Sequence, residues 1–396
     1  MKTAKKIIAV LLACITLFAG LSVMAFAQGG TQLKFNSDGQ FKIMIFADNQ
    51  DNEDIEETTT QIMTEALAKY TPDLVVFLGD NTVSASYETH YTAIEALLAP
   101  TIKAGVPFAL VFGNHDQEGV NGDKEALLEM YQEIGGELCL TTDAAPEIYG
   151  CGNSNVTIFS SDGKNTAFNL WFFDTGSTLV LEDGSRDGYD YIREDQVKWY
   201  EETETALKAA NGGKTVPSIV FQHIIVPDVY KAIYSVELPF ETDGYTYEGV
   251  TYLPVPSFSK YNGIIIEPCS PSYYNKAGQF DAWVEHGDVI AMFCGHDHQN
   301  DFQTVYQGIG INNVSTVGGS AYHDDISRGV GLVTLDESDL STYEYEMIYM
   351  FDLALEEGSQ ISEVEGGRSK FYYRVVKWFR KFINGVHWVI TLGKAT

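Results

Sequence analysis

Short apolar runs alternate with amphipathic segments from Phe41 to Leu335. Short continuous apolar runs are typical of buried strands, and they predict strands at Phe41–Ala47, Leu74–Leu78, Pro107–Phe112, Ala167–Phe173, Pro217–Gln222, Val289–Phe293 and Ile311–Val317. Helical spacing of apolar residues predicts helices at Thr58–Tyr70, Glu88–Ala104, Lys124–Ile134 and Arg193–Ala210. This alternation is typical of layered α/β folds.

Residues 225–280 interrupt this alternation, because they are rich in Tyr, Pro, Ser and Gly and show little periodicity. This composition predicts a loop excursion. Two interpretations stay open, since such an insertion could cover a pocket or run over the surface without a function.

The N-terminal segment has the order of features found in secretory signal peptides. Three lysines precede an apolar run, Ile7–Phe18, and small residues follow as far as Ala27. The run is shorter than the roughly 20 apolar residues that a bilayer-spanning helix needs. We therefore expect residues 1–27 to be cleaved near Gln28 and the protein to be exported, either secreted or associated with the cell envelope.

Residues 366–396 form a separate basic tail in this interpretation, after a main domain at 28–365. Apolar residues recur at Phe371, Val375, Trp378, Phe382 and Val389, and another face carries Lys370, Arg374, Lys377, Lys381 and Asn384. This spacing predicts an amphipathic basic helix over 370–390. It could contact a membrane or the cell envelope, pack onto its own acidic domain, or be only partly ordered.

Charge is distributed unevenly along the 396-residue chain, whose formal net charge is −30. Residues 368–396 contain seven basic residues and no acidic one, whereas residues 28–367 contain 15 basic and 55 acidic residues, a net charge of −40. Such an acidic body repels nucleic-acid phosphates at long range. We expect a small-molecule partner and no nucleic acid.

Four cysteines remain after residue 27, namely Cys139, Cys151, Cys269 and Cys294. Export would allow a disulfide between Cys139 and Cys151, but four unpaired thiols fit the sequence equally well.

Five polar clusters follow apolar strands, at the strand ends where open α/β sheets place their ligand sites. They are Asp48-Asn49-Gln50, Gly79-Asp80-Asn81, Gly113-Asn114-His115-Asp116, Gln222-His223 and Gly295-His296-Asp297-His298. Each alone could be a turn, a helix cap or a buried histidine. Together they supply the carboxylate, imidazole and amide donors that borderline divalent metals accept.

A binuclear site is the natural use of such a donor set. One carboxylate can bridge two ions about 3.5–4 Å apart, and a hydroxide held between them is a nucleophile at neutral pH. Phosphoester hydrolysis benefits from this arrangement, because cations neutralise the phosphoryl oxygens before an anionic nucleophile approaches.

The order and spacing of these clusters resemble the calcineurin-like metallophosphoesterases, over about Phe41 to Leu335. The longer motifs Gly113–Gly119 and Gly295–Phe302 are similar to those of the subgroup labelled purple acid phosphatase 29-like. The resemblance implies an α/β (α+β) fold of four layers, in which a central β-sandwich is flanked by helices. It also implies hydrolysis of a phosphomonoester or phosphodiester by a hydroxide that bridges two metal ions.

The resemblance further implies a role for each residue. Asp48, Gln50, Asp80 and His298 would hold the first metal, and Asp80, Asn114, His223 and His296 the second, with Asp80 as the bridge. His115 would stabilise the transition state or protonate the leaving oxygen. Asp116 would orient its neighbours.

Two departures from the family pattern bear on the metals, which could be divalent or mixed-valence Fe, Mn or Zn. Gln50 stands where the family usually has His, so the first ion has a weaker and harder donor. Val83 stands three places after Asp80, where purple enzymes have a Tyr. We therefore expect no purple colour.

Two rivals remain for the function. One is another metallohydrolase with the same site, such as a nucleotidase or a sugar-phosphate diesterase. The other is a non-catalytic exported protein that keeps the fold and binds metal or ligand.

Four further positions have two possible interpretations or a structural one. Asp174 could support the site or form a turn. His323 could lie at the rim of the site, while Asp324 and Asp325 fit a solvated loop.

Overall fold

The computed structural model describes residues 31–234, 237–238, 245–247, 250–252, 260–272, 274, 277–361 and 368–391. The predicted signal peptide, residues 1–27, and the predicted boundary between residues 365 and 366 lie outside these residues.

The first sheet has five strands in the order β17-β16-β1-β2-β3. Its parallel strands are β1 (Gln40–Phe46), β2 (Leu74–Leu78) and β3 (Phe108–Val111), and antiparallel β16 (Gly329–Asp336) and β17 (Glu344–Tyr349) complete one side. Nearly every residue of β1, β2 and β3 is buried, because both faces of the sheet are covered.

The second sheet has seven strands in the order β12-β14-β15-β13-β8-β5-β4. Its parallel centre consists of β5 (Thr166–Phe173), β8 (Ser218–Gln222), β13 (Val289–Cys294) and β15 (Ile309–Asn313). Antiparallel β4 (Ser154–Phe159), β14 (Asp301–Tyr306) and β12 (Tyr261–Ile264) form its flanks.

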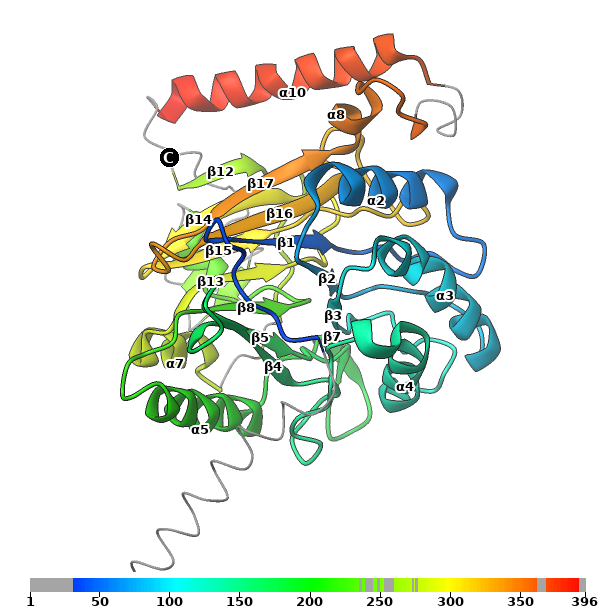
Figure 1. Ribbon diagram of the computed structural model, residues 1–396. Coiled ribbons are helices and arrows are strands. Elements are labelled where there is room, and N and C mark those ends of the chain that lie inside the picture. The colour runs from blue at the N-terminus through cyan, green and yellow to red at the C-terminus, as the bar shows by residue number, and fades with distance from the viewer. Residues whose placement is uncertain are drawn as a thin grey trace, which may run out of the picture.

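The two sheets pack face to face, with helices on both outer sides (Figure 1). Helices α2 (Glu57–Tyr70), α3 (Tyr87–Ala104), α4 (Lys124–Gly135) and α8 (Met350–Ala354) cover the first sheet, and α5 (Glu194–Ala210), α6 (Val229–Ile233) and α7 (Gln279–His286) cover the second. Between the sheets Phe221 stacks on Phe172 and Phe293, at ring-centroid distances of 5.4 and 5.8 Å. The α/β fold of four layers is therefore confirmed.

The chain contains further short elements and one long C-terminal helix. They are the 3-10 turn Gly136–Leu138, a hairpin of β6 (Thr178–Val180) and β7 (Arg186–Tyr189), a small sheet of β9 (Glu237–Leu238), β10 (Tyr245–Tyr247) and β11 (Val250–Tyr252), and the C-terminal helix α10 (Lys370–Thr391). Among the described helices none is long and apolar enough to cross a bilayer.

The prediction that residues 225–280 form a loop excursion was wrong where the structure describes regular elements. This stretch contains α6, three short strands and β12, which pairs with β14 at the edge of the second sheet. Strands this short carry too few residues to show a clear alternation. The predicted strand Ile311–Val317 was also misplaced, since β15 runs from Ile309 to Asn313.

Candidate metal centre

The five polar clusters lie at the carboxyl ends of β1, β2 and β3 in one sheet and of β8 and β13 in the other. The backbone turns sharply there, with positive φ values at Asp48 (51°), Gln50 (48°), Asp80 (48°) and His296 (73°). Positive φ is uncommon outside glycine, and such strain clusters at functional sites. The turns direct side chains from both sheets into one place.

Two glycines make room for the carboxylates. A Cβ at Gly113 would lie 2.2 Å from Asp80 Oδ1, and a Cβ at Gly295 would lie 2.4 Å from Asp48 Oδ2. Only glycine permits such a close approach of backbone and side chain. Steric crowding by the two carboxylates therefore explains why these two clusters begin with glycine.

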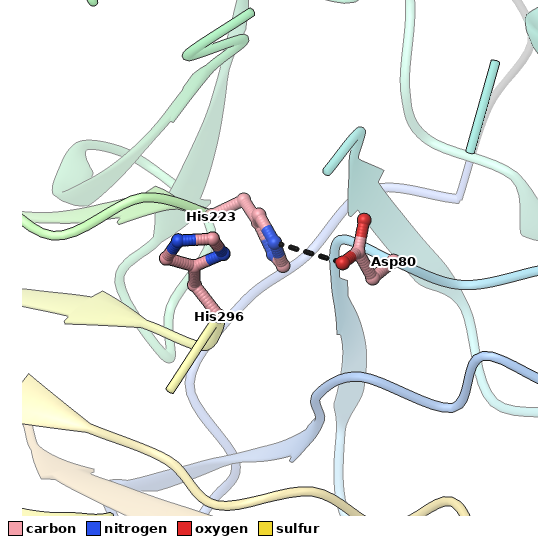
Figure 2. A group of neighbouring side chains, drawn as sticks. All are labelled: Asp80, His223 and His296. Atoms are coloured by element: carbon pink, nitrogen blue, oxygen red, sulfur yellow. Dashed lines mark ion pairs between the residues drawn. The ribbon is translucent and has the colours of Figure 1, made fainter. Parts of the chain in front are cut away.

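Two groups of potential ligands share one carboxylate. Asp80, His223 and His296 form the first group, and Asp48, Asp80 and His298 the second, with the ligand atoms of each group within 4.8 Å of one another. Figure 2 shows the first group, in which the His223 ring lies between Asp80 and His296. All five side chains are buried. The sharing of Asp80 is the arrangement expected of a carboxylate between two ions.

Two amide side chains adjoin these groups. Asn114 Oδ1 lies 3.2 Å from His223 Nε2, and Gln50 Nε2 lies 3.4 Å from Asp80 Oδ2. The structure thus brings together all seven predicted ligands: Asp48, Gln50, Asp80, Asn114, His223, His296 and His298.

The charges of this pocket are unbalanced. Burial would lower the pKa of His223, but the Asp80 carboxylate 3.3 Å away raises it to about 10, and in turn His223 and His115 hold the pKa of Asp80 below its usual value despite burial. Burial and the nearby Asp80 raise the pKa of Asp48 well above its usual value. One cationic ring thus lies among two buried carboxyl groups, and the raised pKa of Asp48 reflects a shortage of positive charge that divalent cations would offset.

The remaining two imidazoles are prepared to donate lone pairs. Burial lowers the pKa of His296 to about 3 and that of His298 to about 4, so both rings are neutral, the form that binds metal. His298 Nδ1–H donates to the Tyr322 carbonyl over 2.9 Å, and His223 Nδ1–H donates to the Leu78 carbonyl over 3.0 Å. These bonds turn the Nε2 atoms towards the carboxylates. The residues present therefore fit a pair of metal ions.

Two tyrosines that the sequence did not single out as site residues line the centre. The Tyr322 ring stacks on His298 at 4.1 Å, and the Tyr189 ring meets His296 edge-on at 4.3 Å. Tyr189 lies in the short strand β7 and Tyr322 in a loop, both distant in sequence from the histidine that they contact. No local sequence pattern therefore predicts their place in the site.

His115 differs from the other histidines of the centre because 42% of its side chain is exposed. Its backbone N–H donates to Asp80 Oδ1 over 2.7 Å, which fixes the residue beside the shared carboxylate. Its Nδ1 lies 2.8 Å from Glu118 Oε1. Glu118 was missed in the sequence, although its position three residues later on the same turn is a recognisable signal.

Asp116 is buried and holds loops together. Its carboxylate accepts hydrogen bonds from the backbone N–H groups of Asn81 (2.9 Å), Thr82 (3.2 Å) and Gly113 (2.7 Å). It thereby joins the loop after β2 to the loop after β3, the two loops that carry Asp80 and Asn114.

The other candidate residues lie outside the two ligand groups. Asp174 pairs with the buried Lys124 over 2.7 Å. His323 Nδ1 bonds to the Ala321 carbonyl of its own loop. The prediction that Asp325 belongs to a solvated loop was wrong, because it pairs with Arg368 over 2.6 Å and accepts a hydrogen bond from Tyr372.

No disulfide joins the cysteines of the described residues. Cys139, Cys151, Cys269 and Cys294 are all free, and the last three are buried. The sequence left two interpretations open, and the structure agrees with the one in which all four cysteines are unpaired thiols.

A four-layer fold with two ligand groups joined by one carboxylate defines a candidate binuclear metalloprotein. The family model described as calcineurin-like phosphoesterase matches residues 41–300. The chain therefore belongs to the calcineurin-like phosphoesterase family, as its motifs indicated.

Curated relatives cover most of the chain. The probable inactive purple acid phosphatases 14 and 29 of Arabidopsis thaliana are 30% and 29% identical to it, over 76% and 74% of this chain and 75% of each relative. Phosphatase DCR2 of Saccharomyces cerevisiae is 28% identical, over 69% of this chain and 46% of that protein. These relatives confirm the similarity to purple acid phosphatase-like proteins.

A solved dimetal phosphatase from Danio rerio aligns with 78% of this chain and 98% of its own. The TM-score is 0.45 at 14% identity, which is too distant to support a functional conclusion.

Proposed function

We propose that this protein hydrolyses phosphomonoesters or phosphodiesters with the help of two metal ions. The observation that carries the proposal is the pair of buried ligand groups that share Asp80. Family membership supports a metal-dependent phosphoesterase, and the charge deficit of the pocket supports the presence of cations.

Each ion would have four protein donors in this proposal, one of which, Asp80, is shared. Asp48, Gln50, Asp80 and His298 would hold the first ion, and Asp80, Asn114, His223 and His296 would hold the second. When bound, the ions supply positive charge to the phosphoryl oxygens and activate water as the nucleophile. Gln50 and Asn114 offer amide oxygens, which suit hard ions better than imidazole does.

The chain itself supplies the proton and the geometry. His115 is the exposed imidazole beside Asp80, so it can reach a substrate and protonate the leaving oxygen. Glu118 Oε1 lies 2.8 Å from Nδ1 of this ring and so fixes its orientation. Asp116 is a positioning residue, since its carboxylate is occupied by backbone N–H groups.

Fe, Mn and Zn are the candidate metals. Because Val83 stands where a tyrosinate ligand would be needed, we propose that the metal-loaded protein lacks a purple absorption band.

The rival proposal is a non-catalytic protein that binds metal or ligand on the same fold. The names of the two Arabidopsis relatives, which call those proteins probable inactive phosphatases, favour it. In this chain the shared carboxylate, the three imidazoles and His115 are all present, and this complete set favours hydrolysis.

Hydrolysis of para-nitrophenyl phosphate and bis(para-nitrophenyl) phosphate by protein loaded with Mn, Zn or Fe tests the proposal. We expect turnover that a chelator abolishes and that Asp80→Asn removes, while the matched surface variant Asp183→Asn keeps it. Metal binding without turnover on either ester would refute catalysis and favour the rival.

We also propose that the protein is exported, on the strength of residues 1–27. Expression with and without these residues, followed by fractionation, tests this. Equal retention inside the cell would refute it.

A further inference from the structure

Helix α10 packs onto the domain with one of its faces. Tyr373 and Val376 are buried against the apolar core that includes α8, and Figure 1 shows α10 lying along the outside of α8. Arg380, itself 3% exposed, donates to both carboxylate oxygens of Asp301 over 2.7 Å and to the Tyr349 hydroxyl. Both bonds to Asp301 come from Nη2, and a buried charge-assisted pair of this kind fixes geometry strongly. The rotation of α10 about its axis is therefore set.

The opposite face of α10 exposes large apolar side chains. Phe371, Val375, Trp378, Phe382 and Val386 recur at intervals of three or four residues, so they form one stripe along the helix. Their exposed fractions are 73, 46, 64, 55 and 43%. Contiguous apolar surface of this kind, pointing away from the domain, marks an interaction surface.

A basic row runs beside this apolar stripe. Lys370, Arg374, Lys377 and Lys381 share the flank of the helix between the docked face and the exposed stripe. Arg374 and Lys381 are exposed, while Lys377 also pairs with Asp352 over 2.5 Å. The flank thus presents cations at the border of the apolar surface, although residues 28–367 are strongly acidic.

We propose that the exposed face of α10 docks on an anionic lipid surface, with the helix parallel to the membrane. An amphipathic helix with aromatic residues on one face and Lys or Arg along its border is suited to the interface between headgroups and acyl chains. The acidic body favours an orientation in which α10 faces the anionic surface and the rest of the domain points away. This inference goes beyond hydrolysis and does not require it.

A second copy of the chain fits the face less well. Its own α10 carries the same cations, so a symmetric pair would leave the basic rows without opposite charges. An anionic bilayer supplies those charges along the whole helix.

Vesicle flotation tests the proposal with residues 28–396, the form expected after cleavage of the predicted signal peptide. The vesicles are phosphatidylcholine alone and phosphatidylcholine mixed with phosphatidylglycerol. Trp378→Ser with Phe382→Ser removes the centre of the stripe, and Arg374→Gln with Lys381→Gln removes two exposed cations. Val305→Ser, at an apolar residue that is 68% exposed on β14, is the matched control. Thermal unfolding checks that every variant remains folded.

We expect the wild type and the Val305→Ser variant to float with the anionic vesicles. The double variant Trp378→Ser, Phe382→Ser should bind the anionic vesicles at least about tenfold more weakly. The double variant Arg374→Gln, Lys381→Gln should bind them about 25-fold more weakly, about fivefold for each charge removed. Added salt should also weaken binding of the wild type. Failure of the wild type to bind anionic vesicles would overturn the proposal. The proposal would also be overturned if sedimentation analysis showed that the wild type is a dimer and the Trp378→Ser, Phe382→Ser variant a monomer.

Discussion

Replacing His115 with alanine separates the proton-transfer role of this residue from a merely structural one. The side chain is 42% exposed and its described partner is Glu118, also exposed at 53%, so its removal should leave the free energy of unfolding nearly unchanged. Loss of a general acid should lower turnover by roughly 10²- to 10⁴-fold.

Glu118→Gln provides a graded comparison. The His115–Glu118 pair is exposed, and exposed ion pairs contribute about 0.2–1 kcal/mol. A loss of at most about 1 kcal/mol corresponds to a fall in turnover of about fivefold or less. The two variants should therefore differ by more than tenfold.

The assay compares phenyl phosphate with para-nitrophenyl phosphate. Phenolate is the poorer leaving group and needs the proton more, so His115→Ala should harm its hydrolysis more than that of the nitrophenyl ester. His323→Ala is the matched control, since this neighbouring imidazole bonds to its own loop. An equal loss on both esters, or none, would refute the role of proton donor.

Three further predictions concern stability and metal binding. Lys124→Met should cost about 3–5 kcal/mol in urea unfolding, because it leaves the buried Asp174 carboxylate without its cation; a cost below about 1 kcal/mol would contradict this. Burial alone would raise the pKa of Asp325, but hydrogen bonds from Tyr372 and Arg368 hold this pKa below its usual 3.8. The carboxylate therefore stabilises the fold fully above pH 3.8, and this contribution is lost as the pH falls below 3.8 and through the lowered pKa of the folded state. Asp325→Asn should flatten this acid dependence of the melting temperature. Gln50→His should lower the dissociation constant for Zn²⁺ at the first metal site, measured in a competition titration. An unchanged affinity would count against Gln50 as a ligand.

The order of the main strands could be predicted from the sequence because each is a buried apolar run followed by a polar cluster. β2 at Leu74–Leu78 agrees with its prediction at both ends. β12 and β17 could not be predicted in the same way. Their stability comes from pairing with β14 and β16, which are distant in sequence, and their own residues show weak patterns.

The candidate site shows the same division. Asp80 and His296 stand in clusters whose residue types indicate metal binding, so the sequence could nominate them. Tyr322 could be placed only once the fold brought its loop against His298. The docked face of α10 was equally hidden, because the partner of Arg380 is Asp301, 79 residues earlier. Long-range partners of this kind leave no periodic signal.

Metal stoichiometry tests the central claim most directly. Purified protein is saturated with Mn²⁺ or Zn²⁺, and bound ions are counted by elemental analysis alongside calorimetric titration. The wild type should hold two ions, His298→Asn should lose the first and keep the second, and Asp80→Asn should lose tight binding of both. A wild type that holds only one ion, or an Asp80→Asn variant that still holds two with unchanged affinity, would contradict a carboxylate shared between two metals.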